Sequence, residues 1–234
     1  MNNKSLLWDS DSDYDVALLS STGEPDPKYP SGQIIAGCDE AGRGCLAGPV
    51  VAAAVILPED YAIEGLDDSK KLTSQQREKL RFQIEDKALA WAVGFASNHE
   101  IDRINILNAT FLAMHRAISC LSVKPSLLLI DGNRFLNYPE ITHRCIVKGD
   151  SRIASISAAS VLAKTYRDAL MKSIHLLYPH FLWDRNKGYP TSEHLLAIRN
   201  NGITSWHRKT FTGCRALGLP FDDIQAINKN KGNK

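Results

Sequence analysis

Short apolar runs alternate with longer stretches of helical periodicity along most of the chain. The apolar runs are too short for typical helices and are bounded by glycine or polar residues, which is the pattern of buried β-strands. They are QIIAGCD (33–39), VVAAAVIL (50–57), WAVGFAS (91–97), SLLLID (126–131) and HRCIVK (143–148). Because SLLLID is almost continuously apolar, we expect that strand to be covered on both faces of a sheet.

Between these runs, apolar residues recur at three- and four-residue steps, the period of an amphipathic helix. Thr73 and Gln76 carry the signature of a capping box, and we expect Ser192 to cap the last helix and Gly202 to end it. The expected helices span 73–90, 99–122, 156–177 and 192–201. This alternation predicts an α/β sheet flanked by helices, with functional residues gathered where strands end.

The two ends of the chain lack this patterning. Residues 1–32 are rich in Asp, Ser and Pro, and we expect them to form an acidic, disordered leader. Residues 33–220 are predicted to form one domain, followed by a polar tail over 221–234. A chain of 234 residues with 44% hydrophobic content can bury one substantial core.

Charge is unevenly distributed along the chain. The net charge of +2 combines −4 in residues 1–32 with +6 in the remainder, and residues 143–215 alone carry +8 with histidine neutral. Such an excess suits a polyanionic partner. Charges that merely solvate a helical surface are the commoner explanation of such a composition, so the motifs must decide.

The cysteine pattern and the amino terminus bear on the compartment. The five cysteines include no CxxC pair and leave one unpaired, which fits neither a disulfide framework nor a zinc site. The amino terminus has no basic segment leading into an apolar run, and no stretch approaches the roughly 18 apolar residues of a membrane span. We therefore expect an unexported, cytoplasmic protein.

Four carboxylates fall at or just after predicted strands. Asp39 closes QIIAGCD and Glu40 follows it, Asp131 closes SLLLID, and Asp150 follows HRCIVK. Carboxylates brought close together repel one another unless a proton or a cation intervenes. Oxygen-only ligands suit Mg²⁺ or Mn²⁺, and two such ions about 4 Å apart would support hydrolysis of a phosphodiester. Any one of these acids alone could equally cap a helix or face solvent.

Five motifs then occur in a fixed order through roughly residues 33–220. They are GCDEAGRGCLAGPVVAAAVIL, LDDSKKL, LLIDGNRF, VKGDSRIASISAASVLAKTYRDALM and NKGYPTSEH. With these motifs the chain resembles ribonuclease HII, the type 2 ribonuclease H family. The resemblance implies a ribonuclease H-like fold: a mixed five-stranded sheet flanked by helices, with a helical carboxyl-terminal segment.

The resemblance also implies an activity. The expected enzyme is an endoribonuclease that hydrolyses the RNA strand of RNA–DNA hybrids and cuts on the 5′ side of ribonucleotides embedded in duplex DNA. It would leave 3′-hydroxyl and 5′-phosphate ends, using two Mg²⁺ or Mn²⁺ ions. The family's catalytic and metal-binding acids fall on Asp39, Glu40, Asp131 and Asp150, the four chosen above.

Further positions match the family's substrate-binding residues. Gly42, Arg43 and Gly44 match a loop whose backbone reads the 2′-hydroxyl of the ribonucleotide, an approach that glycines permit. Tyr189 matches a tyrosine that packs against the next sugar. Standing alone, the loop would be an ordinary turn and Tyr189 a packed surface aromatic.

A second group resembles positions that contact substrate phosphates, where lysines and hydroxyls bind without base specificity. The group consists of Lys70, Lys71, Ser157, Ser160 and Lys164. Solvated lysines, and serines that are simply small enough for close helix packing, are the simpler interpretation of any single member.

Two assignments stay open at this stage, and one related family is disfavoured. Asp168 could tune the metal site, or could form a salt bridge with Arg167 or Lys164. RALGLPF (215–221) loosely suggests a weak sliding-clamp contact, although a helix end followed by a proline turn is simpler. The short leader disfavours the sister type, ribonuclease HIII, which has a folded amino-terminal domain.

Two rival functions are distinguishable by experiment. A nuclease or DNA transposition enzyme of the same fold would need no 2′-hydroxyl in its substrate, and a hybrid-binding module would bind without metal-dependent cleavage. Four retained acids favour the enzyme, which we expect to be a monomer.

Overall fold

A computed structural model describes residues 32–61, 63, 65–66 and 72–215. In this part of the chain, one five-stranded sheet has the strand order β3-β2-β1-β4-β5. The strands are β1 (Ile35–Ala41), β2 (Val50–Ile56), β3 (Ala90–Ala96), β4 (Leu127–Asp131) and β5 (Thr142–Ile146). Each overlaps one of the apolar runs in the sequence, and β2 and β4 are buried along nearly their whole length, as expected for strands covered on both faces.

The sheet is mixed. Strand β2 runs antiparallel to both β1 and β3, whereas β1, β4 and β5 are mutually parallel. In the β1–β4 pair, Ile35 lies opposite Leu127 and Cys38 opposite Ile130. The carboxyl ends of β1, β4 and β5 therefore meet at one edge of the sheet.

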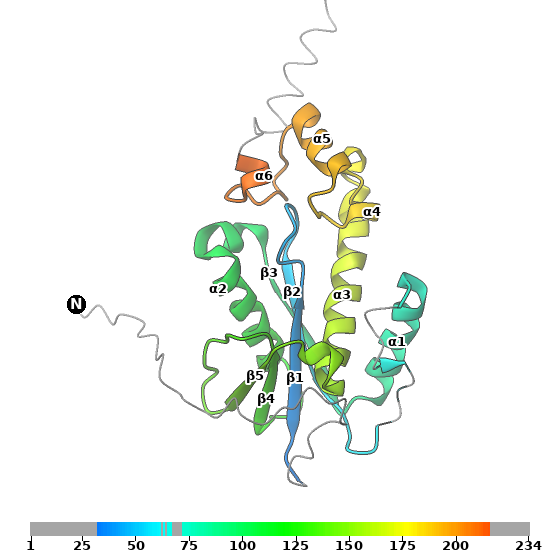
Figure 1. Ribbon diagram of the computed structural model, residues 1–234, viewed down its shortest axis with the longest axis vertical. Coiled ribbons are helices and arrows are strands. Elements are labelled where there is room, and N and C mark those ends of the chain that lie inside the picture. Colours follow the sequence, from blue (N-terminus) through cyan, green and yellow to red (C-terminus); the bar gives the residue numbers. More distant parts are fainter. Residues whose placement is uncertain (1–31, 62, 64, 67–71, 216–234) are drawn as a thin grey trace, which may run out of the picture.

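Helices cover both faces of the sheet (Figure 1). Helix α2 (Asn98–Ser119) lies on one face, where Ile101, Met114 and Ile118 pack against the strands. Helix α3 (Ala154–His175) lies on the other face, with α1 (Ser74–Lys87) outside it. The predicted α/β architecture, a mixed five-stranded sheet flanked by helices, is confirmed.

The carboxyl-terminal part forms a helical cap beyond one end of the sheet (Figure 1). It contains α4 (Trp183–Asn186), α5 (Ser192–Asn201) and α6 (Thr212–Arg215), with a 3₁₀ turn at Pro179–Phe181. Its small core joins residues of the loop after β1 to the end of α3 and the cap: Leu46, Ala47, Met171, Ile174, Phe181, Trp183, Ala197, Ile198 and Cys214. The cap is thus packed against the loop that follows the acidic strand β1.

Most expected boundaries agree with the structure, with three differences. Strand β1 continues to Ala41, so Asp39 lies inside the strand and not at its end. Thr191, not Ser192, caps α5 by accepting a hydrogen bond from the His194 N–H. Helix α2 is kinked at Asn105, which has a φ of +65°. The Thr73–Gln76 capping box and the stop at Gly202 are confirmed.

Gly37 permits a close contact between helix α3 and the sheet. A Cβ atom at this position would lie 2.2 Å from the backbone carbon of Ser155, at the start of α3. Only glycine allows the backbone of α3 to approach β1 this closely. The amino-terminal half of α3 is thereby placed beside the acidic part of β1.

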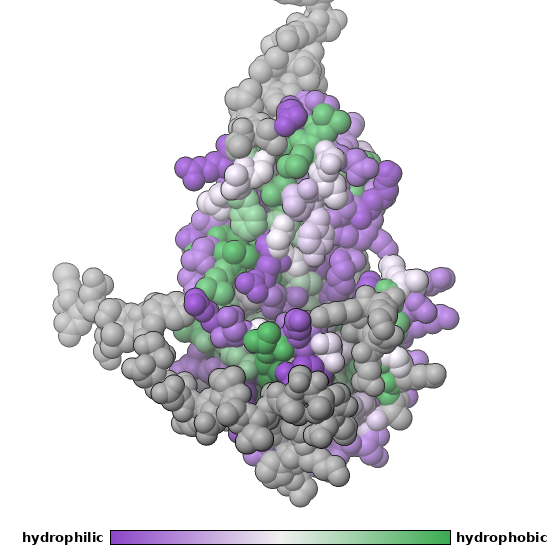
Figure 2. All heavy atoms as spheres, in the orientation of Figure 1, coloured by the Kyte–Doolittle hydropathy of each residue, from purple (hydrophilic) through white to green (hydrophobic). Residues whose placement is uncertain are grey.

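The surface of the described residues is mainly hydrophilic on the side shown in Figure 2, with separate hydrophobic spots and no continuous apolar patch. None of the helices in the described ranges has the length and apolar character needed to cross a bilayer.

Candidate active site

Asp39 and Asp131 are neighbours across the parallel strands β1 and β4. Each lies one residue beyond the paired Cys38 and Ile130. Asp39 is buried, with 5% of its surface exposed, and its Oδ1 accepts a hydrogen bond from the Glu40 N–H at 2.6 Å. The Ser160 hydroxyl of α3 also donates to the Asp39 carboxylate.

Asp131 connects the end of β4 to Asp150. Its Oδ1 accepts hydrogen bonds from the Gly149 N–H at 2.7 Å and from the Asp150 N–H at 3.4 Å. Both donors belong to the 3₁₀ turn Gly149–Ser151, which Lys148 enters with a φ of +57°. The turn brings the buried Asp150 back to the edge where β4 ends.

The carboxylates influence one another electrostatically. Burial raises the pKa of Asp39 well above its usual range, and the negative charges of Glu40 and Asp131 raise it further. Burial also raises the pKa of Glu40, while its 3.0 Å ion pair with Arg43 opposes the rise and the charge of Asp131 adds to it. Three like charges at one edge are held together against their repulsion, which a bound cation would relieve.

This donor set fits a hard divalent cation. The groups are carboxylate oxygens from β1, β4 and the turn after β5, the ligand chemistry that Mg²⁺ and Mn²⁺ prefer. In the described residues, no three acidic, histidine or cysteine side chains already stand in a complete ligand arrangement. Metal binding would therefore require the carboxylates to adjust, with substrate oxygens and water completing the coordination.

A cavity of about 370 Å³ opens beside these acids. It is lined by Glu40, Ala41, Gly42, Arg43, Gly44, Arg77, Asp150, Ser160, Val161, Lys164 and Tyr189. The structure therefore brings two of the four predicted acids, the predicted glycine loop, one predicted serine, Lys164 and Tyr189 together around one space. Asp39 and Asp131 lie at the strand edge that carries Glu40.

The loop after β1 is held from behind by two buried arginines. Gly42 has a φ of +95°, and a Cβ there would lie 2.0 Å from the Arg167 Nε. The Arg208 guanidinium donates hydrogen bonds to the carbonyl oxygens of Gly42 at 2.8 Å and of Arg43 at 2.9 Å. Gly42 is therefore required both by its backbone conformation and by the space that Arg167 occupies.

Tyr189 also lines the cavity, from the loop between α4 and α5. Its ring is 39% exposed, and the Lys164 Nζ is 5.5 Å from the ring centroid. Its carbonyl oxygen accepts hydrogen bonds from the Thr191 N–H at 2.8 Å and from the His194 Nδ1 at 2.9 Å. Held by its backbone, Tyr189 presents a partly exposed aromatic ring to the cavity.

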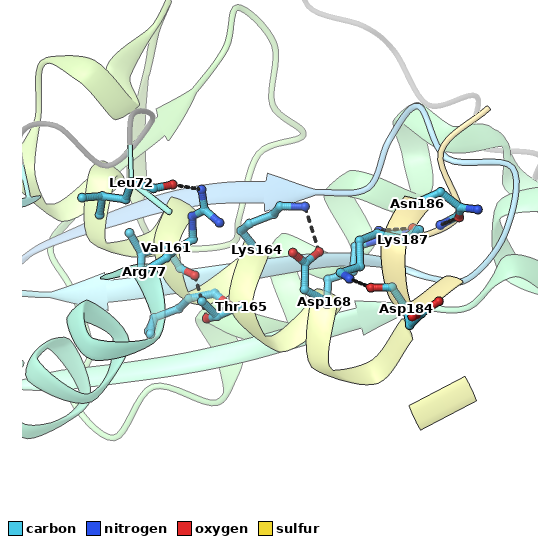
Figure 3. Close-up of polar contacts among 12 residues, drawn as sticks. Leu72, Arg77, Val161, Lys164, Thr165, Asp168, Asp184, Asn186 and Lys187 are labelled. Atoms are coloured by element: carbon cyan, nitrogen blue, oxygen red, sulfur yellow. Dashed lines mark hydrogen bonds and ion pairs between the residues drawn. The ribbon is translucent and has the colours of Figure 1, made fainter. Parts of the chain in front are cut away.

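The other predicted phosphate contacts have different surroundings. Lys164 forms a 2.8 Å ion pair with Asp168, so the salt bridge considered for Asp168 is made to Lys164 and not to Arg167 (Figure 3). Ser157 is buried and its hydroxyl donates to the Leu66 carbonyl at 2.6 Å, away from the cavity lining. Lys70 and Lys71 lie outside the described residues.

Three arginines at or behind the cavity were not predicted from the sequence as site residues. Arg77 of α1 lines the cavity beside Val161 (Figure 3), and its guanidinium donates to the Leu72 carbonyl at 2.9 Å. Arg167 and Arg208 are completely buried. In the sequence all three look like solvated charges, although Arg167 lies within the VKGDSRIASISAASVLAKTYRDALM motif and Arg77 follows the LDDSKKL motif by a few residues; Arg208 had no such signal.

Comparison with known proteins agrees with this geometry. The family model for Ribonuclease HII matches residues 36–214. Ribonuclease HII of Parabacteroides distasonis is 62% identical over 186 residues, which cover 80% of this chain and 94% of that protein.

Two solved structures have the same fold. One is ribonuclease H2 from Pyrococcus horikoshii, with a TM-score of 0.68 and 27% identity over 82% of this chain and 98% of that chain. The other is the PCNA:RNase HII complex from Archaeoglobus fulgidus, with a TM-score of 0.60 and 25% identity over 70% of this chain and 86% of that chain.

The sheet, the acidic edge and these matches define a ribonuclease H, an endonuclease of RNA–DNA hybrids that depends on divalent metal. Within that class, the chain belongs to the ribonuclease HII family.

Proposed function

We propose that this enzyme cuts the phosphodiester on the 5′ side of a ribonucleotide, both in RNA–DNA hybrids and at single ribonucleotides in duplex DNA. The products carry 3′-hydroxyl and 5′-phosphate ends. The main support for this proposal is that one cavity is lined by carboxylates, by the backbone of a glycine-rich loop and by an exposed tyrosine ring. Hydrolysis of a phosphodiester, recognition of a ribose and packing on a sugar each have a suitable group there.

Asp39, Glu40, Asp131 and Asp150 are the proposed metal ligands. When bound, two Mg²⁺ or Mn²⁺ ions would supply Lewis acidity on both sides of the phosphorus, one toward the attacking water and one toward the leaving oxygen. The Gly149 N–H fixes the Asp131 carboxylate, and the Ser160 hydroxyl fixes that of Asp39. Such contacts orient ligands before the ions arrive.

Recognition of the ribose is assigned to the Gly42–Gly44 loop. Gly44 leaves open space at its Cα, with no atom within 4 Å of the position of a Cβ. A sugar can therefore approach the backbone at this point, and amide groups can contact its 2′-hydroxyl. That hydroxyl is the feature that distinguishes RNA from DNA at the cut site.

The cavity also offers groups suited to the rest of the strand. Lys164 and Ser160 are placed to contact phosphates without reading bases. The Tyr189 ring is placed to pack on the sugar after the ribonucleotide, where an apolar contact favours deoxyribose over a hydroxylated sugar. Lys70 and Lys71 are proposed to join the phosphate contacts on the strength of the resemblance alone.

One assay tests this proposal directly. A DNA duplex carrying a single ribonucleotide is incubated with the enzyme, with and without Mg²⁺ or Mn²⁺, beside an all-DNA duplex and a long hybrid. We expect metal-dependent cuts at the 5′ side of the ribonucleotide and in the hybrid, and none in the DNA. Equal cutting of the DNA would favour a nuclease or transposition enzyme of the same fold, and binding without cutting would favour a hybrid-binding module.

A weak contact with a sliding clamp is a second proposed interaction. It is supported by the RALGLPF segment and by the structurally similar RNase HII of Archaeoglobus fulgidus, which was solved as a complex with PCNA. Apart from Arg215, that segment lies outside the described residues. Loss of clamp binding on truncation after Arg215, with hybrid cleavage unchanged, would support the contact, and unchanged clamp binding would refute it.

We place the enzyme in the cytoplasm. The five cysteines are free thiols in the structure, and Cys38, Cys45 and Cys214 are buried. Free thiols of this kind persist in a reducing compartment.

A further inference from the structure

The buried guanidinium of Arg208 fixes the orientation of two peptide groups in the ribose-reading loop. It donates to the carbonyl oxygens of Gly42 and Arg43, and also to those of Gly48 at 3.0 Å and Pro49 at 3.2 Å. Arg208 is 0% exposed, and its position lies 166 residues from Gly42 along the chain. One planar group thus binds both ends of the loop.

The direction of these carbonyls determines the direction of the neighbouring amides. In a planar trans peptide the C=O of one residue and the N–H of the next point in opposite directions. Because the carbonyls of Gly42 and Arg43 point to Arg208, the N–H groups of Arg43 and Gly44 point away from it. Neither N–H donates to another described residue.

The side of the loop opposite Arg208 is the cavity. Gly42, Arg43 and Gly44 line it, whereas Arg208 is buried behind them. Two adjacent amide donors are therefore directed to the space where the ribonucleotide would lie. A 2′-hydroxyl oxygen can accept such hydrogen bonds, and a deoxyribose carbon cannot.

His207, the residue before Arg208, belongs to a chain of neutral histidines. The His207 Nδ1 accepts from the Thr204 N–H at 2.9 Å, so its proton is on Nε2. This N–H lies 3.2 Å from the His194 Nε2, an acceptor that it shares with the Trp183 indole N–H at 3.0 Å. The His194 Nδ1 then donates to the Tyr189 carbonyl at 2.9 Å. The Thr204–Arg208 segment is therefore bonded to both recognition elements, the glycine loop and Tyr189.

We infer that Arg208 is a positioning residue for recognition of the 2′-hydroxyl: it sets the peptide orientation that directs the Arg43 and Gly44 amides to the ribose. The inference rests on the proposed role of this loop. It assigns ribose selectivity to a side chain that does not touch the substrate. Lysine cannot replace it, because a single ammonium group cannot reproduce the planar fork that reaches carbonyls on both sides of the loop.

Arg167 provides a matched control. It is equally buried and also donates to backbone carbonyls, those of Ala47 at 3.0 Å, Pro49 at 3.1 Å and Lys187 at 2.8 Å. It makes no hydrogen bond to the Gly42 or Arg43 carbonyl. Arg167→Lys should therefore cost stability as Arg208→Lys does, while disturbing the direction of the two amides less, because Arg167 packs against Gly42 without binding the Gly42 or Arg43 carbonyl.

The test compares affinities for two duplexes of one sequence, one with a single ribonucleotide and one entirely of DNA, in EDTA so that neither is cut. We expect Arg208→Lys to lower the ribose preference of the wild type by about tenfold, the value of one or two lost hydrogen bonds. Arg167→Lys should lose clearly less of that preference. An unchanged preference in Arg208→Lys, or an equal loss in both variants, would overturn the inference.

A second measurement needs no variant, in case Arg208→Lys does not fold. In amide NMR spectra of the wild type, the Arg43 and Gly44 N–H signals should shift downfield on binding the ribonucleotide duplex and much less on binding the DNA duplex. Equal shifts with both duplexes would refute the inference. If the wild-type enzyme shows no ribose preference at all, the proposed function itself fails, and the two failures are thereby distinguished.

Discussion

Asp39 and Asp131 stand side by side on the parallel strands β1 and β4, each one residue past the paired Cys38 and Ile130. Parallel pairing places them at the same edge of the sheet. Their charges repel, and this contributes to the raised pKa of Asp39. Strand register thus brings two of the proposed metal ligands together.

Asp131→Asn should abolish cleavage while the fold is kept. The asparagine Oδ1 can still accept from the Gly149 N–H, but the ligand charge is lost. Loss of an outer partner alone typically costs 10- to 100-fold, so we expect a fall in kcat of more than about 100-fold. The affinity for the hybrid in EDTA should be unchanged. The melting temperature without metal should be kept, because the substitution relieves repulsion between the carboxylates. Near-normal turnover would contradict the role of Asp131.

Gly42→Ala and Gly44→Ala should affect different properties. At Gly42 a Cβ would collide with the Arg167 guanidinium at a positive φ, and we expect a loss of about 1–3 kcal/mol in unfolding free energy. At Gly44 the space is open, so stability should change by less than about 0.5 kcal/mol while cleavage at a single ribonucleotide falls. Urea unfolding and cleavage rates separate the two. Equal stability losses would argue against this difference.

Tyr189→Ala and Tyr189→Phe separate the ring from its hydroxyl. If the ring packs on a sugar, its removal should lower kcat/KM by about tenfold, or ~1.4 kcal/mol of lost apolar contact. Phenylalanine keeps the ring and should retain most of the activity. The comparison uses duplexes with one ribonucleotide. Equal losses in both variants would instead assign the role to the hydroxyl.

Asp168→Asn tests whether this acid takes part in catalysis. Its carboxylate forms an ion pair with Lys164, and such partly exposed pairs contribute ~0.2–1 kcal/mol. We expect only a severalfold change in kcat/KM and an unaltered metal requirement. A loss on the scale of Asp131→Asn, or a shifted metal dependence, would show that Asp168 belongs to the metal site.

His207→Asn should reduce the acid sensitivity of the fold. Burial lowers the pKa of His207 from 6.5 to about 3, so the native state holds it neutral while the unfolded chain is protonated below about pH 6.5. The stability contribution is therefore present above the unfolded pKa and is lost as pH falls toward 3. The variant should melt below the wild type at about pH 7.5, with a smaller difference at about pH 5. An equal difference in melting temperature at both pH values would show that His207 does not couple stability to pH.

Much of the fold could be predicted from the sequence because the information is local. A run such as SLLLID can bury both of its faces only as a strand, and the Thr73–Gln76 pair defines a helix start within four residues. The same patterns place Asp131 at the end of a strand and Asp150 after one, although Asp39 lies inside β1 and not at its end. Parallel pairing then brings Asp39 and Asp131 together, and the 3₁₀ turn after β5 adds Asp150.

The sequence by itself determined the strands, the main helices and the acids at the sheet edge, since each depends on neighbours a few residues away. Tertiary structure alone decided that Ser157 bonds to Leu66, that Lys164 and not Arg167 pairs with Asp168, and that Arg208 binds the Gly42 carbonyl. Hydrogen-bond partners such as Arg208 and Gly42 are 166 positions apart, and no local pattern records which carbonyl a buried guanidinium will meet. Only the packing of the carboxyl-terminal cap against the loop after β1 selects that partner.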